Sequence, residues 1–216
     1  MSLHELRTPI FAVQGYLETL LNGAINDPKV NITFLEKAIS NTQNLNNLLN
    51  DLIDISMIES GEMRMSFRYF NLREFLMPVV DDLKYLAENK GISLDLVILN
   101  EKLTVFGDKS KLRQVLNNLI QNAIKYTDAG KVDVVAEEES RSVTIKVKDT
   151  GIGIPKEDIN RIFERFYRVD KARSREVGGT GLGLAICKHI IEAHNSIITV
   201  NSEYKKGSEF SFKLKK

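Results

Sequence analysis

Apolar residues recur at spacings of three and four over the first part of the chain, which is the period of one helix face. This spacing predicts a first helix that ends at about Leu21, where the run 22–28 supplies turn residues. A second helix is predicted to begin at Asn31 or Thr33. We therefore expect residues 1–65 to form an antiparallel helical hairpin.

The apolar stripe of the second helix is too wide for one short partner helix. It consists of Leu35, Ala38, Thr42, Leu45, Leu48, Leu52 and Ile55, widened by Ile39, Leu49 and Ile53. Because two helices alone bury little surface, we expect the hairpin to pair with a second copy as a homodimeric four-helix bundle. The alternative is that the hairpin packs on the second part of its own chain.

Helical and alternating periods follow one another from Phe70 onward. The pattern predicts strands over 94–99, 103–106, 132–136, 143–147, 197–200 and 209–214, and helices over 72–89, 109–126, 156–163 and 182–194. Because regular strand–helix–strand alternation is absent from this order, we expect an α+β fold in which helices cover a mixed sheet. Residues 66–69 are then a linker, and residues 70–216 form the second domain.

Composition narrows the class of protein only a little. The formal net charge of +1 over 216 residues gives no reason to expect a nucleic acid or an acidic membrane surface as partner. Cys187 is the only cysteine, so no disulfide can form within the chain. The sequence has no signal peptide and no apolar run long enough to span a bilayer, which favours a cytoplasmic location. The start just before His4 indicates a piece of a longer protein.

A histidine, a carboxylate and a hydroxyl lie within one turn of the first predicted helix, at His4, Glu5 and Thr8. His4 and Thr8 share a helix face, away from the apolar stripe. A neutral imidazole, with an unperturbed pKa of about 6.5, is a good nucleophile near pH 7, and Glu5 could orient the ring or accept its proton. The alternative is an ordinary surface histidine. A zinc site is disfavoured because position 8 lacks the second histidine of zinc proteases.

The predicted helix 109–126 carries a polar stripe of Asn118, Asn122 and Lys125. An amide oxygen is a hard ligand suited to Mg²⁺, and a lysine can meet a phosphate as a point charge. The alternative is a solvated helix face with a lysine near the C-terminus, although paired asparagines inside a helix weigh mildly against it.

A second patch, Asp149-Thr150-Gly151-Ile152-Gly153, directly follows a predicted strand. The carboxylate can accept a hydrogen bond from an exocyclic amine such as that of adenine, and the glycines would let the backbone approach a flat base. A plain turn after a strand is the alternative interpretation.

Two further patches follow along the chain. In 163–168, aromatic residues alternate with cations, and Arg168 is available to a phosphate, although such aromatics are more often core. In 178–184, glycines open a helix whose N–H groups can meet an anion, with neither Walker nor Rossmann spacing. We expect the long charged stretch between the patch at Asp149 and the patch 178–184 to be a nucleotide lid.

Taken in order, these motifs resemble the catalytic core of sensor histidine kinases of two-component systems, and the resemblance covers essentially the whole chain. The run from His4 to Pro9 is similar to the H box of that family. Residues 118–126 are similar to its N box and residues 149–153 to its G1 box. Residues 163–168 are similar to its F box and residues 179–183 to its G2 box.

The resemblance implies a dimerisation and phosphotransfer hairpin joined to an ATP-binding domain of the Bergerat type. His4 would attack the γ-phosphate of ATP with help from Glu5, and the phosphoryl group would pass to an aspartate in the receiver domain of a response regulator. Thr8 would position water for dephosphorylation of the regulator. Members of this family are usually membrane-anchored upstream, and a core of this kind is then the cytoplasmic part.

The resemblance also implies ATP and Mg²⁺ as cofactors. Asn122 would hold the Mg²⁺, Tyr126 would lie beside the nucleotide, and Asp149 would bind adenine. The implied nucleotide contacts are Asn118, Asn122, Lys125, Tyr126, Asp149, Gly151, Gly153, Tyr167, Arg168, Gly179, Thr180, Gly181, Leu182 and Gly183.

Two other functions compete with this one. An ATP-gated conformational protein of the same superfamily, like chaperone and topoisomerase ATPases, needs a water-activating carboxylate on the helix where Asn118, Gln121 and Asn122 stand. A catalytically silent dimer scaffold is disfavoured by the intact motifs. Phe11, where Thr or Ser is frequent, and Asn195-Ser196, where Gly-Gly is frequent, depart from the family pattern.

Overall fold

The computed structural model describes residues 3–169 and 180–216, with side chains described from Arg7 onward. Contacts along this part of the chain divide it into two compact units. The hairpin unit ends at Glu62 and takes in Thr180, and the sheet unit begins at Met63. Among the helices within these ranges, none has the length and apolar character needed to cross a membrane.

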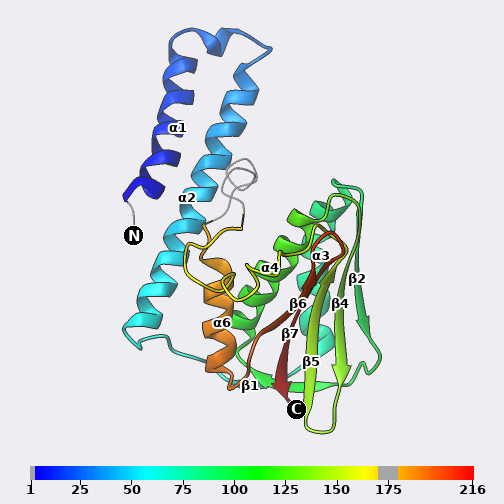
Figure 1. The fold of residues 1–216 in the computed structure, drawn as a ribbon. Coiled ribbons are helices and arrows are strands. Elements are labelled where there is room, and N and C mark those ends of the chain that lie inside the picture. Colours follow the sequence, from blue (N-terminus) through cyan, green and yellow to red (C-terminus); the bar gives the residue numbers. More distant parts are fainter. Residues whose placement is uncertain (1–2, 170–179) are drawn as a thin grey trace. The chain divides into compact units, whose positions relative to one another are not determined.

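The hairpin unit consists of two long helices, as predicted. Helix α1 spans Leu3–Leu21 and helix α2 spans Asn31–Glu59, and the short 3₁₀ helix η1, Ala24–Asn26, lies between them (Figure 1). Tyr16 of α1 stacks on Phe34 of α2, with ring centroids 5.9 Å apart. This stacking joins the two helices through Phe34, which lies beside the predicted apolar stripe of α2.

Much of the apolar stripe of the hairpin is exposed in a single chain. Leu20, Ala38 and Ile55 are buried. The exposed residues of the stripe and its ends are Ile10, Phe11, Leu17, Leu21, Ile25, Ile32, Leu35, Ile39, Leu49, Ile53 and Met57. A large apolar surface of this kind marks an interaction site on a soluble protein.

The sheet unit is built on a mixed sheet with strand order β1-β3-β7-β5-β4-β2, in which β6 also pairs with β7. Strands β2 and β4 are parallel, and the other pairs are antiparallel. This topology confirms the predicted α+β fold. The strands are β1 Arg68–Asn71, β2 Ile92–Ile98, β3 Thr104–Gly107, β4 Gly130–Glu138, β5 Ser142–Asp149, β6 Thr199–Glu203 and β7 Gly207–Lys215.

Helices α3, Leu72–Glu88, α4, Lys109–Tyr126, and α6, Gly183–Ala193, cover one face of this sheet (Figure 1). The apolar side of α4 is buried and consists of Leu112, Val115, Leu116, Leu119, Ile120, Ala123 and Ile124. Cys187 of α6 is buried against α4, as expected for a small core residue. Packing of α4 into this core leaves its polar side available for a site.

Two segments of the sheet unit differ from the prediction. Residues 156–163, predicted as a helix, form successive turns, in which the Arg161 N–H donates to the Asp158 carbonyl at 2.8 Å. That prediction was wrong because so short a run gains too few helical hydrogen bonds to form a helix on its own. Strand β1 was not predicted, and it begins at Arg68, inside the stretch 66–69 that was expected to be a linker.

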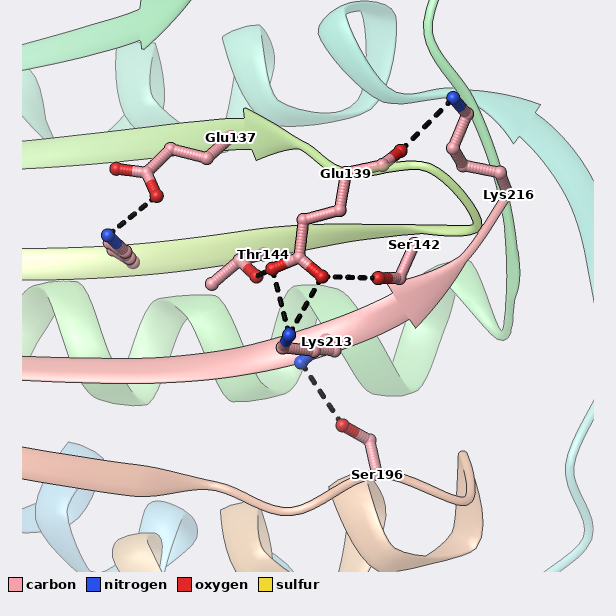
Figure 2. A network of polar contacts seen from close by, with 8 residues as sticks. Glu137, Glu139, Ser142, Thr144, Ser196, Lys213 and Lys216 are labelled. Carbon is pink, nitrogen blue, oxygen red and sulfur yellow. Dashed lines mark hydrogen bonds and ion pairs between the residues drawn. The ribbon is translucent and has the colours of Figure 1, made fainter.

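A network of polar side chains ties the turn between β4 and β5 to β7 (Figure 2). The Glu139 carboxylate accepts hydrogen bonds from Ser142 Oγ at 2.9 Å, Thr144 Oγ1 at 2.7 Å and Lys213 Nζ at 2.7 Å. These bonds, with that from Lys213 the largest contribution, lower the pKa of Glu139 to about 2. Glu139 therefore stays ionised, and keeps its partners, at any pH at which the chain is expected to work.

Candidate functional site

The predicted phosphotransfer residues lie on α1. His4 and Glu5 belong to the start of this helix, and their side chains lie outside the described part of the chain. Thr8 is exposed, and Pro9 follows it inside the helix. Because residues four apart share a helix face, the backbone places positions 4 and 8 on one side of α1.

The amide side chains of α4 lie on the part of the helix that is not buried in the core. Asn118, Asn122 and Lys125 are half-buried there. Gly183, the first residue of α6, packs closely against this face, because a Cβ on Gly183 would lie 2.6 Å from Asn118 Oδ1. The absence of a side chain at Gly183 therefore leaves room for the Asn118 amide. Two of the predicted motifs, far apart in the sequence, meet at this contact.

Two cations influence each other at the C-terminal end of the same face. Burial lowers the pKa of Lys125 from its usual value, and the positive charge of Arg168 lowers it further. The Lys125 ammonium also lies 5.2 Å from the centroid of the Tyr126 ring. Since like charges repel each other and a nearby negative charge favours the charged form of Lys125, an anionic group bound here would relieve the repulsion. The pair is therefore suited to a polyphosphate.

Asp149 ends strand β5 and is 7% exposed. Its Oδ1 accepts hydrogen bonds from the Gly151 N–H at 2.8 Å and the Ser208 N–H at 3.2 Å. Both bonds end on Oδ1, so Oδ2 accepts from neither of these amides. Burial raises the pKa of Asp149, and the two backbone bonds partly oppose that effect. The carboxylate is thus held rigidly by one oxygen, with the other oriented by the same bonds.

Gly151 and Gly153 lie against the backbone of the sheet unit itself. A Cβ on Gly151 would lie 2.3 Å from the Tyr126 carbonyl oxygen, and one on Gly153 would lie 2.1 Å from the Glu203 carbonyl oxygen. Gly153 also has a φ of +65°, a conformation that favours glycine. Packing inside the protein therefore accounts for both glycines, whereas the sequence interpretation assigned them to the approach of the backbone to a base.

A hydrogen bond from the Phe166 N–H to the Gly181 carbonyl, at 2.9 Å, joins the patch 163–168 to the patch 178–184. Gly181 has a φ of +71°, and a Cβ there would lie 2.9 Å from the Phe166 Cα. Leu182 is fully buried, so its side chain belongs to the core, whereas Thr180 is half-buried. Gly179 lies outside the described residues.

Tyr167 is fixed by the turns that precede it. Its hydroxyl donates a hydrogen bond to Asp158, and the Arg161 guanidinium lies 4.2 Å from its ring centroid. The Tyr167 hydroxyl is therefore engaged within the protein, while the next residue, Arg168, is the one that influences Lys125.

Sequence analysis did not single out Gly207 and Ser208, which support Asp149 from the start of β7. Gly207 has a φ of +108°, and a Cβ there would lie 2.1 Å from the Asp149 carbonyl oxygen. The signal available in the sequence was a lone glycine between the two closing strands, where close approach of another backbone is common.

A polar helix face with amides and a cation, a buried carboxylate at a strand end and a glycine that opens α6 are features suited to binding a nucleotide. Residues 107–216 match the family described as histidine kinase-, DNA gyrase B-, and HSP90-like ATPase, and residues 2–61 match the His Kinase A (phospho-acceptor) domain. The chain therefore belongs to the histidine kinase-like ATPases, and its phospho-acceptor domain places it among the two-component sensor histidine kinases.

Named relatives agree with this family. The chain is 38% identical to the sensor histidine kinase WalK of Bacillus subtilis over 98% of its own length, and it spans 35% of that protein. The histidine kinase AdeS of Acinetobacter baumannii is similar in structure, with a TM-score of 0.79, 28% identity and coverage of 98% of this chain and 97% of that one. A histidine kinase ThkA solved in complex with the response regulator protein TrrA has a TM-score of 0.74 and 28% identity, over 99% of this chain and 59% of that one.

Proposed function

We propose that this chain is the catalytic core of a protein histidine kinase, which phosphorylates His4 from ATP and passes the phosphoryl group to an aspartate of a response regulator. The observation that carries the proposal is the contact of Gly183 with Asn118, which joins two motifs into one face suited to a nucleotide. The matches to an ATPase family and to a phospho-acceptor domain support the same function.

In the proposed reaction, a ring nitrogen of His4 forms a bond to the γ-phosphorus while the bond from that phosphorus to the bridging oxygen of the β-phosphate breaks. ADP leaves, and the N–P bond is later exchanged for an O–P bond on the regulator's aspartate. The neutral ring attacks through its unprotonated nitrogen and gains positive charge as the N–P bond forms, so Glu5 is proposed to accept the proton from the other ring nitrogen. Thr8 is proposed to position water when the regulator is dephosphorylated.

The sheet unit is proposed to hold the nucleotide. Mg²⁺ takes few protein ligands and keeps phosphate and water oxygens, so one amide oxygen, that of Asn122, fits it. Asn122 lies one turn after Asn118 on the half-buried polar side of α4, which supports this assignment. When bound, Mg²⁺ would neutralise part of the phosphate charge.

The remaining contacts follow from charge and hydrogen bonding. Lys125 and Arg168 are assigned to the phosphates because an anion relieves their mutual repulsion. Asp149 is assigned to the exocyclic amine of adenine, with Tyr126 beside the nucleotide.

Two partners are proposed. A receiver domain of a response regulator is supported by the ThkA complex with TrrA, a histidine kinase to which this chain is similar. A second copy of this chain is supported by the exposed apolar face of the hairpin. We place this core on the cytoplasmic side, where ATP is available, and a membrane anchor upstream in the parent protein is proposed on the family resemblance.

The test is incubation with γ-labelled ATP and Mg²⁺, comparing the wild type with His4→Gln. Acid-labile label on the wild type that disappears in His4→Gln supports the proposal. His189→Gln, which removes a partly exposed histidine of α6, is the matched control and should keep the label. Equal label in His4→Gln, or phosphate release without any labelled protein, would contradict phosphorylation at His4.

A further inference from the structure

The C-terminal end of α4 has an unusual hydrogen-bond partner. The last carbonyls of a helix lack partners within the helix and need donors from elsewhere. Here the ammonium of Lys90 donates to the carbonyl of Ile124 at 2.9 Å, that of Lys125 at 3.0 Å and that of Thr127 at 2.9 Å. An ammonium has three donors, and all three are used at this one helix end.

The other carbonyls of this turn are satisfied locally. The Thr127 hydroxyl donates to the Ala123 carbonyl at 2.8 Å, and the Ile152 N–H donates to the Tyr126 carbonyl at 3.1 Å. Thr127 itself is fully buried. Lys90 therefore supplies the donors that neither the helix nor the loop after Asp149 provides.

The position of Lys90 is itself fixed by the turn that ends α3. Its backbone N–H donates to the Ala87 carbonyl at 3.0 Å, and Gly91, with a φ of +69°, donates to the Glu88 carbonyl at 2.8 Å. A positive charge at a helix C-terminus is also favoured by the helix dipole. The backbone of Lys90 is thus fixed by the turn after α3, and its positive charge interacts favourably with the C-terminal end of α4.

We propose that Lys90 is a positioning residue for the nucleotide site, acting through the last turn of α4 on the phosphate-binding Lys125 and on the loop that follows Asp149. The inference rests on the proposed function for the identity of the ligand. The same turn contacts that loop twice, because the Tyr126 carbonyl accepts from Ile152 and packs against Gly151. One ammonium therefore holds together the phosphate side and the adenine side of the site.

Lys90 acts indirectly, because its three donors are committed to backbone carbonyls. A lysine whose role was only to keep the surface hydrated would point its ammonium into solvent, whereas the Lys90 ammonium donates to three carbonyls at one helix end. Removal of the ammonium is therefore expected to loosen the turn that carries Lys125, with the core of α4 left in place.

The experiment measures the dissociation constant of a fluorescent ATP analogue with Mg²⁺ for Lys90→Met, at a temperature well below unfolding. We expect binding to weaken by about tenfold, which corresponds to about 1.4 kcal/mol. Hydrogen exchange of the Ile152 amide should become faster in the same variant. Lys102→Met, which removes an exposed lysine of the β2–β3 turn, is the matched control and should leave both readouts unchanged.

A rescue separates positioning from simple loss of stability. Lys90→Cys, alkylated to S-aminoethylcysteine, restores an ammonium at nearly the same reach, and affinity should return; the other cysteine, Cys187, is buried. Lys90→Gln, a milder change, serves if Lys90→Met does not fold. If Lys90→Met binds the nucleotide with wild-type affinity and only its melting temperature falls, the inference about Lys90 is overturned and the proposed function is not. A wild-type chain that binds no nucleotide would overturn the proposed function and this inference together.

Discussion

Asp149 shows how two backbone bonds decide what a side chain can recognise. Because Oδ1 accepts from the Gly151 and Ser208 amides, an asparagine at this position must turn its carbonyl toward them. Its NH₂ group then stands where Oδ2 was. The carboxylate offers an acceptor to a nucleotide base, whereas the amide would offer a donor.

Asp149→Asn is therefore expected to weaken ATP binding by about 10- to 100-fold, since a hydrogen bond to a charged acceptor contributes about 1.5–3 kcal/mol. The same variant should gain affinity for inosine triphosphate, because its 6-oxo group accepts from the new NH₂. Dissociation constants of ATP and inosine triphosphate, measured for the wild type and for Asp149→Asn, test this change of nucleotide preference. Equal losses for the two nucleotides would argue against contact between Asp149 and the base.

At the scale of elements, one histidine joins three segments of the sheet unit. His194, just after α6, accepts at Nε2 from the Asp108 N–H at 3.0 Å, and its Nδ1 lies 2.7 Å from the Ile190 carbonyl. The Asp108 carboxylate caps α4 and also accepts from the Ser66 N–H at 2.7 Å. Since Nδ1 must donate and Nε2 must accept, the ring is held neutral.

This arrangement makes the stability of the sheet unit depend on pH. Burial lowers the pKa of His194 below 6.5, and the neighbouring Asp108 only partly offsets that effect. Between the lowered pKa and 6.5 the unfolded chain binds more protons, so stability falls as pH decreases through this window. We expect the melting temperature to drop between pH 7 and 5, and His194→Gln to lose most of that slope. A slope that persists in His194→Gln would point to another group.

The elements that could be predicted are those whose signals are local. Helix α4 has an apolar face at helical spacing and an aspartate, Asp108, as its N-cap, and its predicted range 109–126 is confirmed. Segment 156–163 carries helix-like spacing, but its shape is set by turns and by the contacts of Tyr167. The support of α4 by Lys90 joins residues 34 to 37 positions apart, which no local pattern reveals.

The site, too, has features that local sequence signals predict and features that depend on tertiary contacts. Asn118, Lys125 and Asp149 were predicted from residue type, spacing and resemblance. Asn118 and Lys125 lie half-buried on the polar side of α4, whereas Asp149 is buried at the end of β5. Gly183 packs against Asn118, and Gly151 packs against the Tyr126 carbonyl. Both contacts join segments that are far apart in the sequence, so they could not be predicted from local patterns. Residue type predicts which groups carry the chemistry, whereas tertiary contacts decide what holds them.

At the scale of the whole molecule, the two compact units carry separable tasks. The residues assigned to the phosphates and to adenine, Lys125, Arg168 and Asp149, belong to the sheet unit, and the exposed apolar stripe belongs to the hairpin unit. Nucleotide binding should therefore survive changes that prevent dimerisation. The proposed phosphorylation uses His4 as well, so we expect it to be the activity that depends on both units.

Ile39 of α2 is 67% exposed and belongs to the proposed dimer face, between the exposed Leu35 and Leu49 along the helix. Ile39→Glu places a charge where an apolar contact is expected, and burial of an unpaired charge is costly. We expect the dimer dissociation constant to rise by about tenfold or more in analytical ultracentrifugation, with nucleotide affinity unchanged. Ser40→Glu adds the same charge one position along and should stay dimeric. A dimer of wild-type affinity in Ile39→Glu would show that the stripe faces something other than a second copy.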